Sequence, residues 1–530
     1  MQAMKQMQAP VNVVGSSIFG RYPKISSEKT YNMFISDEWL VSFAGWKKVI
    51  DLLPVEESQG RGAFRSIRNN IVVVVVNSSV FILDTSLTQT FIGNLDTSVG
   101  DVFMDENLNN QICIVDGVNA YIYNFKLGTL TKQTLGSTLI PNYVCYHNTF
   151  FLFGNGDTSS NGAAWYAYSY ATDTTITETT QLALQTKSDY AIAVQRLPGG
   201  GNNVLVFGTA VTELWTQVGG LQNYQRNISF NIDYGCLSVS TIASSDKYVI
   251  WLGINESNSP VITLFSGKQA QSISTDGIDY QLGLLQYPEQ STAFFYRGDG
   301  HLFYQITFYN PNDNLSLIYD VDTQKFFHLS DAHLNYHPAR RIVYLNNDIY
   351  FVSLNNGSFY KTNTDLTTYN ENIGENIGND DPDINKEIPR IRICSNIRKS
   401  DSGQFRSRNL RITIDQGNDP YVSILSLTEA LNDIITEDSE IIITETGGAV
   451  VMEGTLYGSI PYCPKVDLTI STDGGVAFSN TVTINLNPEG IRQNILSWQR
   501  QFGICNDLIF KFRFWGRSYW AVYNGTLDIY

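Results

Sequence analysis

The sequence is poor in the residues that build catalytic and metal sites. It has five histidines, and its six cysteines are scattered without a Cys-x-x-Cys pair. His333 and His337 stand four apart, but the glutamate of the H-E-x-x-H motif is missing and Pro338 argues against a helix. No G-x-S-x-G elbow is present either. We therefore expect no catalytic residue, no metal and no cofactor, and we expect the cysteines to be buried free thiols.

Positive charge is also scarce. The 530 residues include 35 Lys and Arg against 51 Asp and Glu, which gives a formal net charge of −16. This balance argues against a protein coated in basic patches that grip nucleic acid. It does not argue against a wide passage through which DNA slides, because strong electrostatic attraction to phosphates would impede that movement.

Long hydrophobic segments are missing as well. The longest apolar run, Ile71–Val76, is too short to span a bilayer. The first ten residues are polar and rich in Gln and Met, without the positive segment and apolar core of a secretion signal. We therefore expect no membrane insertion, and a protein made and kept in a reducing, aqueous compartment.

Short apolar segments are abundant between about residues 59 and 365. Each has four to eight residues rich in Val, Ile, Tyr and Phe, as in Ile71–Val76, Gln111–Val115 and Val261–Phe265. Turn-forming pairs such as Asp-Gly and Asn-Asn separate them. The segments come in pairs that repeat at roughly forty residues, the length of one four-stranded propeller blade. The pattern predicts an all-β chain with a six- or seven-bladed β-propeller, and a pair of stacked β-sandwiches is the alternative.

The remaining sequence predicts a second all-β domain at the C-terminus. Phe510, Phe512 and Phe514 alternate with polar or amphipathic residues, the period of two expected of a sheet with one buried face. We expect this domain to be β-sandwich-like, with the N-terminal leader packed on it. The predicted parts are a leader at 1–58, the propeller at 59–365, a linker at 366–388, and the C-terminal domain at 389–530 with an acidic insertion at 416–465.

One stretch of the C-terminal domain is distinctly basic. It supplies our candidates for residues that face DNA: Arg390, Arg392, Arg398, Lys399, Arg406 and Arg408. A solvated hairpin face or a set of salt bridges between subunits would explain the same charges. Local charge alone motivates the DNA hypothesis.

Three groups of motifs resemble one protein family. The first is YNMF at 31–34 followed by LVSFAG at 40–45, the second is VLVFGTAVTELWTQVG at 204–219, and the third joins LTISTDGG at 468–475, WQRQFG at 498–503 and the strand at 510–515. In this order they resemble the tail hub of short-tailed bacteriophages (podoviruses), also called the tail nozzle or packaged-DNA stabilisation protein. Ala44 departs from the proline usual in the family's first motif, and the acidic insertion has no counterpart.

The resemblance implies a homohexameric ring below the portal and its adaptor. A central channel would retain the packaged double-stranded DNA, independently of its sequence, and conduct it during ejection. Tail fibres or spikes would dock on the outside, with the polar loop 154–162 as a candidate dock, and a plug or needle would sit at the lower end. The protein would belong to the virion tail and be assembled in the host cytoplasm. For the ring contacts we expect large apolar side chains of the leader and the last sheet: Trp39, Phe43, Trp46, Trp498, Trp515 and Trp520.

Two other functions stay open at this point. A propeller-type virion glycosidase or polysaccharide depolymerase would need paired carboxylates and exposed aromatic residues at the central funnel. A monomeric propeller that binds a protein partner is the third possibility, although such a protein gains little from a large second sheet domain. The hub is a structural protein without catalysis, so it accounts for the missing catalytic motifs.

Overall fold

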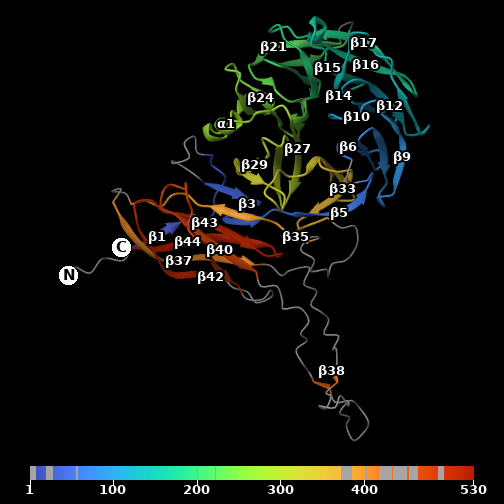
Figure 1. Ribbon diagram of the computed structural model, residues 1–530. Coiled ribbons are helices and arrows are strands. Elements are labelled where there is room, and N and C mark those ends of the chain that lie inside the picture. The colour runs from blue at the N-terminus through green and yellow to red at the C-terminus, as the bar shows by residue number, and fades with distance from the viewer. Residues whose placement is uncertain are drawn as a thin grey trace, which may run out of the picture.

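The computed structural model consists of a ring of β-sheets joined to a second all-β part (Figure 1). It describes residues 7–19, 28–54, 58–199, 201–220, 223–371, 385–399, 403–416, 432–433, 451–452, 464–486 and 495–530. Both the first and the last described strands lie in the second part. In these ranges, no helix is long and apolar enough to cross a membrane.

The first four blades of the ring are antiparallel sheets of four consecutive strands. Blade 1 has β6 (Gly60–Ser66), β7 (Ile71–Val76), β8 (Ser79–Leu83) and β9 (Gln89–Asn94); blade 2 has β10 (Phe103–Glu106), β11 (Gln111–Val115), β12 (Ala120–Asn124) and β13 (Thr129–Lys132); blade 3 has β14 (Pro141–His147), β15 (Phe150–Asn155), β16 (Ala164–Thr172) and β17 (Thr175–Ala183); blade 4 has β18 (Ala191–Arg196), β19 (Asn203–Gly208), β20 (Thr212–Gln217) and β21 (Tyr224–Ile232).

Three further blades complete the ring. Blade 5 has β22 (Gly235–Cys236), β23 (Ala243–Ser244), β24 (Val249–Ile254), β25 (Pro260–Phe265) and β26 (Ala270–Ser272); blade 6 has β27 (Ser291–Gly298), β28 (His301–Phe308), β29 (Leu315–Asp320) and β30 (Lys325–Leu329); blade 7 has β31 (Ala339–Leu345), β32 (Asp348–Ser353), β33 (Ser358–Asn363) and β5 (Gly45–Asp51). The predicted all-β propeller is confirmed, and it has seven blades.

The hydrophobic core of the ring lies between neighbouring blades. Val73 and Val75 of blade 1 pack with Ile112 and Ile114 of blade 2, and similar clusters follow around the ring. The second and third strands are therefore covered on both faces, which is why they read as unbroken apolar runs. Asparagines with positive φ, such as Asn70 at 51° and Asn148 at 55°, make the tight hairpin turns between first and second strands.

Blades 6 and 7 continue beyond their fourth strands. β30 pairs with β2 (Lys29–Tyr31), and the sheet then runs through β36 (Arg390–Ile393), β43 (Ile509–Trp515), β40 (Lys465–Ser471) and β41 (Val482–Asn485). In blade 7, β5 comes from the N-terminal leader, and β34 (Thr368–Asn370) and β35 (Asn385–Glu387) extend the sheet outward. The sheet of blade 6 thus continues into the C-terminal domain, whereas blade 7 is extended by strands of the leader and of the expected linker.

We call the C-terminal domain, together with the leader strands packed on it, the platform. A second sheet completes it. It runs β3 (Met33–Ser36), β4 (Trp39–Ser42), β44 (Trp520–Ile529), β37 (Phe405–Gln416) and β42 (Ile495–Cys505), and β1 (Met7–Val11) also pairs with β44. Phe34 of the leader, Phe303 of blade 6, Leu410 and Phe512 belong to one hydrophobic cluster between the two sheets. The predicted sandwich-like domain with the leader packed on it is confirmed.

Parts of the predicted segments lie outside the described residues, among them most of the expected linker, residues 372–384. Within the expected acidic insertion at 416–465, β38 (Asn432–Asp433) pairs with β39 (Val451–Met452). The short helix α1 (Asp276–Leu282) had no counterpart among the predictions.

The cysteines agree with the prediction of buried free thiols. Five of the six are unpaired and buried: Cys113, Cys145, Cys236, Cys394 and Cys505. Burial raises the pKa of each of these thiols. Cys463 lies outside the described residues.

Candidate functional site

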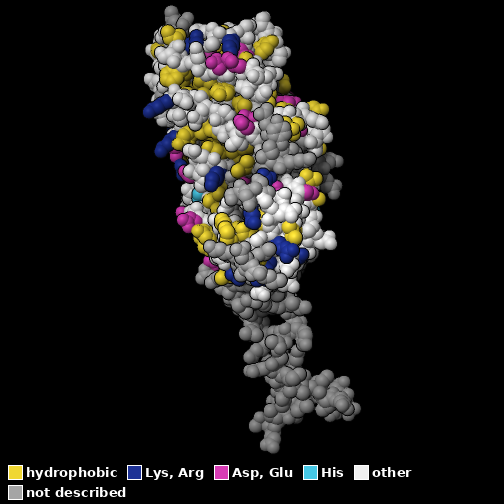
Figure 2. Space-filling view, turned by 90° about the vertical axis from the view of Figure 1, so that its left-hand side faces the viewer, with side chains coloured by type: hydrophobic (Ala, Val, Ile, Leu, Met, Phe, Trp, Pro, Cys, Tyr) yellow, Lys and Arg dark blue, Asp and Glu magenta, His cyan; other side chains and the backbone are white. Residues whose placement is uncertain are grey.

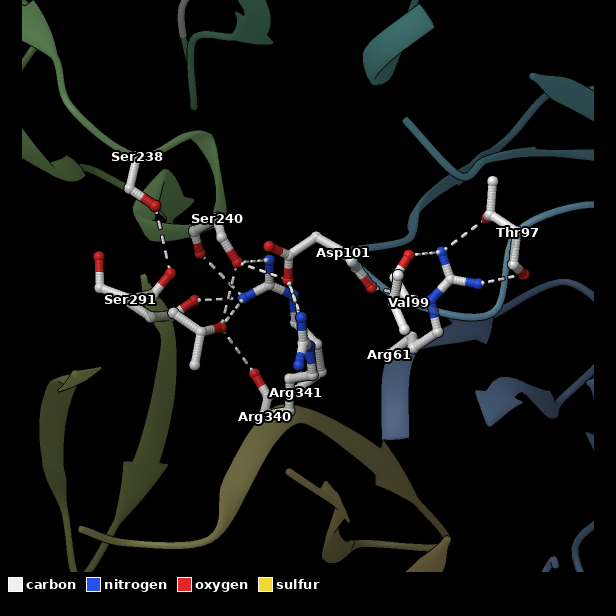
Figure 3. Close-up of polar contacts among 12 residues, drawn as sticks. Arg61, Thr97, Val99, Asp101, Ser238, Ser240, Ser291, Arg340 and Arg341 are labelled. Carbon is white, nitrogen blue, oxygen red and sulfur yellow. Dashed lines mark hydrogen bonds and ion pairs between the residues drawn. The ribbon is translucent and has the colours of Figure 1, made fainter. Parts of the chain in front are cut away.

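The centre of the ring is the usual place for a ligand or a passage in a propeller, and here polar side chains fill it (Figure 3). Arg61, on the first strand of blade 1, is completely buried. Its guanidinium donates hydrogen bonds to the carbonyl oxygens of Gly100 at 2.8 Å, Thr97 at 2.8 Å and Val99 at 2.6 Å. Arg61 therefore fixes the connection between blades 1 and 2 at the mouth of the ring.

Asp101, at the end of this connection, contacts the neighbouring blade 7 and, across the ring, blade 5. Its Oδ1 accepts hydrogen bonds from Arg340 Nη2 of blade 7 at 2.8 Å and from Ser240 Oγ of blade 5 at 2.8 Å. Arg341 donates to Ser240 and to Thr292 Oγ1, at 2.9 Å and 2.7 Å. Burial favours the neutral carboxyl, but Arg340 and Arg341 hold the pKa of Asp101 below its ordinary value.

A second ion pair joins blades 2 and 4. Arg196 Nη1 of blade 4 lies 2.8 Å from Asp105 Oδ2 of blade 2, and the backbone N–H of Tyr146 donates to the same oxygen at 2.8 Å. Burial raises the pKa of Asp105, and the Arg196 charge opposes this effect. Asp101 thus meets Ser240 of blade 5, and Asp105 of blade 2 meets Arg196 of blade 4, so the described side chains leave the propeller's own centre no passage wide enough for DNA.

The carboxylates at the centre are engaged in structural contacts. Asp101 and Asp105 are paired with arginines, and Glu106 accepts hydrogen bonds from Ser66 Oγ at 2.6 Å and from the Ile67 N–H at 3.2 Å. These contacts hold the central strands and their connections together.

One group of side chains has metal-ligand chemistry. His301, Asp320 and Asp322 place one ligand atom each within 4.8 Å of one another. However, Asp320 Oδ2 already contacts His301 Nδ1 at 2.9 Å and accepts from Thr323 Oγ1 at 2.7 Å, and Asp322 Oδ2 accepts from the Leu302 N–H at 2.9 Å. The hydrogen bonds of the β29–β30 turn account for this geometry, and we assign no metal to it. His333 and His337 do not meet, because His333 is exposed and His337 packs against Trp46.

Two of the six DNA candidates are corrected by the structure. Arg390 and Arg392 are completely buried. Arg392 donates to the carbonyl oxygens of Val13 at 2.7 Å and Ser16 at 3.1 Å and pairs with Glu28, while Arg390 donates to the Gly516 carbonyl at 2.8 Å. A guanidinium enclosed in this way ties the leader and the last hairpin to the platform and cannot reach DNA.

The other four candidates lie at the surface. Arg398 pairs with Asp507 at 2.7 Å, and Lys399 next to it is half-buried. Arg406 and Arg408 point outward from β37, and Arg408 lies 5.0 Å from the ring of Tyr530. Their contact with DNA stays a prediction.

The six DNA candidates leave out Arg411, a further arginine of this basic stretch. Asn409 has a φ of 53°, and the strand register shifts between Arg408 and Leu410, so Arg411 rather than residue 410 follows Arg408 on the exposed face. A simple alternation along β37 cannot find this bulge. The asparagine itself, which tolerates positive φ, was the available signal.

Most of the side chains predicted to form contacts between subunits are instead buried within their own chain. Phe43, Trp46, Trp498 and Trp520 are at most 7% exposed. Trp46, for example, stacks on Tyr369 at 3.5 Å between ring centroids. For these four side chains the prediction of contacts between subunits is wrong, because they join the leader and the last strands to their own sheets. Trp39 and Trp515 are half-exposed, beside Tyr523 and Arg513 respectively, and stay candidates.

Comparison with known proteins gives distant structural likenesses and one family. The chain is similar to a streptogramin B lyase, with 13% identity, a TM-score of 0.38 and coverage of 62% of this chain and 99% of that one. It is also similar to virginiamycin B lyase from Staphylococcus aureus, with 12% identity, a TM-score of 0.40 and coverage of 59% and 97%. Likenesses this distant say nothing about activity. No curated protein matches the chain.

The family model described as "Bacteriophage P22 Gp10, beta-propeller" matches residues 22–367. The match spans the propeller together with leader strands β2 to β5, of which β2 extends blade 6, β5 completes blade 7, and β3 and β4 lie in the platform. Since it covers well over half of the sequence, the chain belongs to this family of phage virion proteins that stabilise packaged DNA.

Proposed function

We propose that this protein is the subunit of a tail hub, or nozzle: a homohexameric ring below the portal and adaptor that retains the packaged DNA and conducts it during ejection. The observation that carries the proposal is the closed centre of the propeller. Asp101 contacts Arg340 of blade 7 and, across the ring, Ser240 of blade 5, and Arg196 of blade 4 pairs with Asp105 of blade 2. Because a single copy offers no axial passage for DNA, a family member that stabilises DNA has to enclose it between copies.

Two surface regions support the remaining roles in this proposal. Arg398 and Lys399 are the sequence-predicted basic residues next to the platform's last hairpin, and we assign them to phosphate contacts in the lumen. Their charge acts without regard to DNA sequence. The exposed loop around Thr158–Asn161 is our candidate dock for a tail fibre or spike, and the portal–adaptor complex and a plug or needle are the other expected partners.

We further propose that the protein is not an enzyme. A glycosidase needs one carboxyl that donates a proton and one that acts as base or nucleophile. The central carboxylates Asp101 and Asp105 are instead ion-paired with Arg340 and Arg196. Screening the purified protein for polysaccharide hydrolysis tests this point, and measurable turnover abolished by an Asp105→Asn substitution would contradict it.

The ring itself is tested by electron microscopy of the concentrated protein, alone and mixed with the phage's portal–adaptor complex. Rings with a central hole, formed alone or on the adaptor, are the expected result. Isolated monomers in both samples would refute the hub.

The lumen assignment is tested in the phage by replacing both Arg398 and Lys399 with Ala. We expect poorer genome retention, whereas the control Lys268→Ala, at an exposed turn of blade 5, leaves retention unchanged. Equal retention in the two phages would refute the assignment.

A further inference from the structure

One face of the propeller is acidic and apolar at the same time. It is formed by three neighbouring connections, residues 273–290, 309–314 and 330–338, which we call the acidic loop face. The three segments contain five carboxylates and no Lys or Arg: Asp276, Asp279, Glu289, Asp313 and Asp331. Asp276 and Glu289 are exposed, so this face carries negative charge into the solvent.

Hydrogen bonds join the three segments into one surface. The backbone N–H groups of Gln286 and Tyr287 donate to the carboxylate of Asp313 at 2.7 and 2.8 Å. Asn314 Nδ2 donates to Asn335 Oδ1 at 3.0 Å, which links the second segment to the third. The loops therefore present a defined shape rather than three separate tips.

This surface exposes large apolar side chains. The exposed fractions are 43% for Tyr280, 58% for Leu284, 41% for Tyr287 and 41% for Leu334. Figure 2, which views the molecule from the left of Figure 1, shows hydrophobic side chains exposed among a few charged ones along this side. Tyrosines with a polar tip and an apolar body are favoured at the centre of protein interfaces.

The outer face of the platform has the opposite charge. β37 exposes Arg406, Arg408 and Arg411, and β42 exposes Arg500. Among the described residues of β1, β37, β42 and β44, no carboxylate is exposed, since Asp528 is 3% exposed and Asp415 is half-buried. We call this the basic sheet face. It stands out in a chain with a net charge of −16.

The basic sheet face also carries apolar side chains. Ile504 lies opposite Arg406 and Ile495 lies opposite Thr413 in the register of β37 and β42, so both share the face of the arginines. Their exposed fractions are 54% and 58%. Phosphate binding has no use for exposed isoleucines, whereas a protein interface combines arginine with apolar contacts. This combination favours a protein over DNA as the occupant of the basic sheet face.

We propose that the basic sheet face of one copy docks on the acidic loop face of the next copy. The two faces match in charge and both present apolar side chains, and they lie on different parts of the same chain. A contact between two different patches is heterologous, and repeating it builds a ring when the rotation closes. This inference rests on the proposed hub and names the surfaces that would assemble it.

Charge reversal tests the pairing of the two faces. Arg406→Glu with Arg411→Glu alters the basic sheet face, and Asp276→Lys with Glu289→Lys alters the acidic loop face. All four side chains are exposed, and circular dichroism and thermal melting check that each variant folds. Self-association is measured by sedimentation velocity over a range of concentrations. We expect each double variant to weaken self-association at least roughly 100-fold, because like charges then face each other.

Mixing the two charge-reversed variants is the decisive experiment. An equimolar mixture of the two double variants pairs one reversed face with the other, so we expect complexes that neither variant forms alone. The control Lys268→Glu, at an exposed turn outside both faces, should associate like the wild type.

The outcomes separate this inference from the proposed function. A wild type that stays monomeric alone and on the adaptor refutes the hub, and the inference with it. A wild type that forms rings while both reversed variants do so equally well refutes only the pairing of these faces. If Arg406→Glu with Arg411→Glu keeps the rings but loses packaged DNA, the basic sheet face belongs to DNA and the inference is wrong.

Discussion

Blades 1 to 5 and blades 6 and 7 are built from similar strands but end differently. The outer strand β13 of blade 2 is exposed or half-exposed throughout, whereas in the outer strand β30 of blade 6 every residue after Lys325 is buried. The difference follows from pairing, since β30 is covered by leader strand β2 and the rest of the platform sheet. Blade 6 thus shares its sheet with the platform, and blade 7 is completed by a leader strand, so the joint between the domains consists of paired strands.

The joint depends most on Arg392, so removing its charge should have the largest effect. Arg392→Met removes the guanidinium that pairs with Glu28 and donates to the Val13 and Ser16 carbonyls, and we expect a loss of about 3–5 kcal/mol of unfolding free energy, measured by denaturant titration. Adding Glu28→Gln should recover part of the loss, because the side chain that faced the guanidinium is then uncharged. A single variant as stable as the wild type would show that the leader is not anchored here.

Lowering the pH should have the second-largest effect on the stability of the joint. Burial lowers the pKa of His337 to about 3, and burial together with Lys29 does the same for His328. Both side chains lie where blades 6 and 7 meet the leader, beside Trp46 and Tyr31. An unfolded histidine has a pKa near 6.5, so between these values the unfolded chain binds more protons and stability falls as the pH falls.

The expected cost is about 2 kcal/mol at pH 5 for each histidine, relative to neutral pH. Denaturant titration at pH 7.5 and pH 5 measures it. His337→Gln should reduce the pH dependence by the share of one histidine, and an unchanged dependence would contradict the assignment.

One matched core substitution in blade 6 and one in blade 2 compare the two kinds of blade directly. Their expected effect on the unfolding free energy is smaller. Ile318→Val in blade 6 and Ile114→Val in blade 2 each remove one methylene from a fully buried site, so each should cost about 0.5–1.5 kcal/mol. Ile318 packs in the cluster shared with the platform, whereas Ile114 packs between blades 1 and 2. Hydrogen exchange should therefore show faster exchange in the platform strands for Ile318→Val only. Equal changes in the platform for both variants would mean that the whole chain opens as one unit.

The exposed pair of Arg398 and Asp507 should matter least for stability. Its side chains approach to 2.7 Å, but that of Arg398 is 53% exposed. We expect Arg398→Ala to change the unfolding free energy by less than about 1 kcal/mol. A larger loss in denaturant titration would place Arg398 in the joint rather than at the surface.

The sequence predicted the middle strands of the blades well and their outer strands poorly. Strands such as β7 and β11 are covered on both faces and therefore read as apolar runs, while β9 and β13 face solvent and carry polar residues. The strand order beyond β30 could not be predicted, because β2, β36 and β43 come from distant parts of the chain.

The candidate sites show the same limit. Arg390 and Arg392 read as a basic surface because charge in a local window is usually solvated, but their partners lie in the leader and the last hairpin. The contacts that close the propeller, such as Asp101 with Ser240, also join residues far apart in sequence. The exposed Arg406 and Arg408 were found from local charge, since no long-range contact hides them.

Cryo-electron microscopy of the DNA-filled virion tests the central claim most directly. The account predicts DNA density on the axis of a ring of these subunits, with every propeller centre filled by protein at Asp101, Arg196 and Arg340. DNA density running through the centre of a propeller would contradict it.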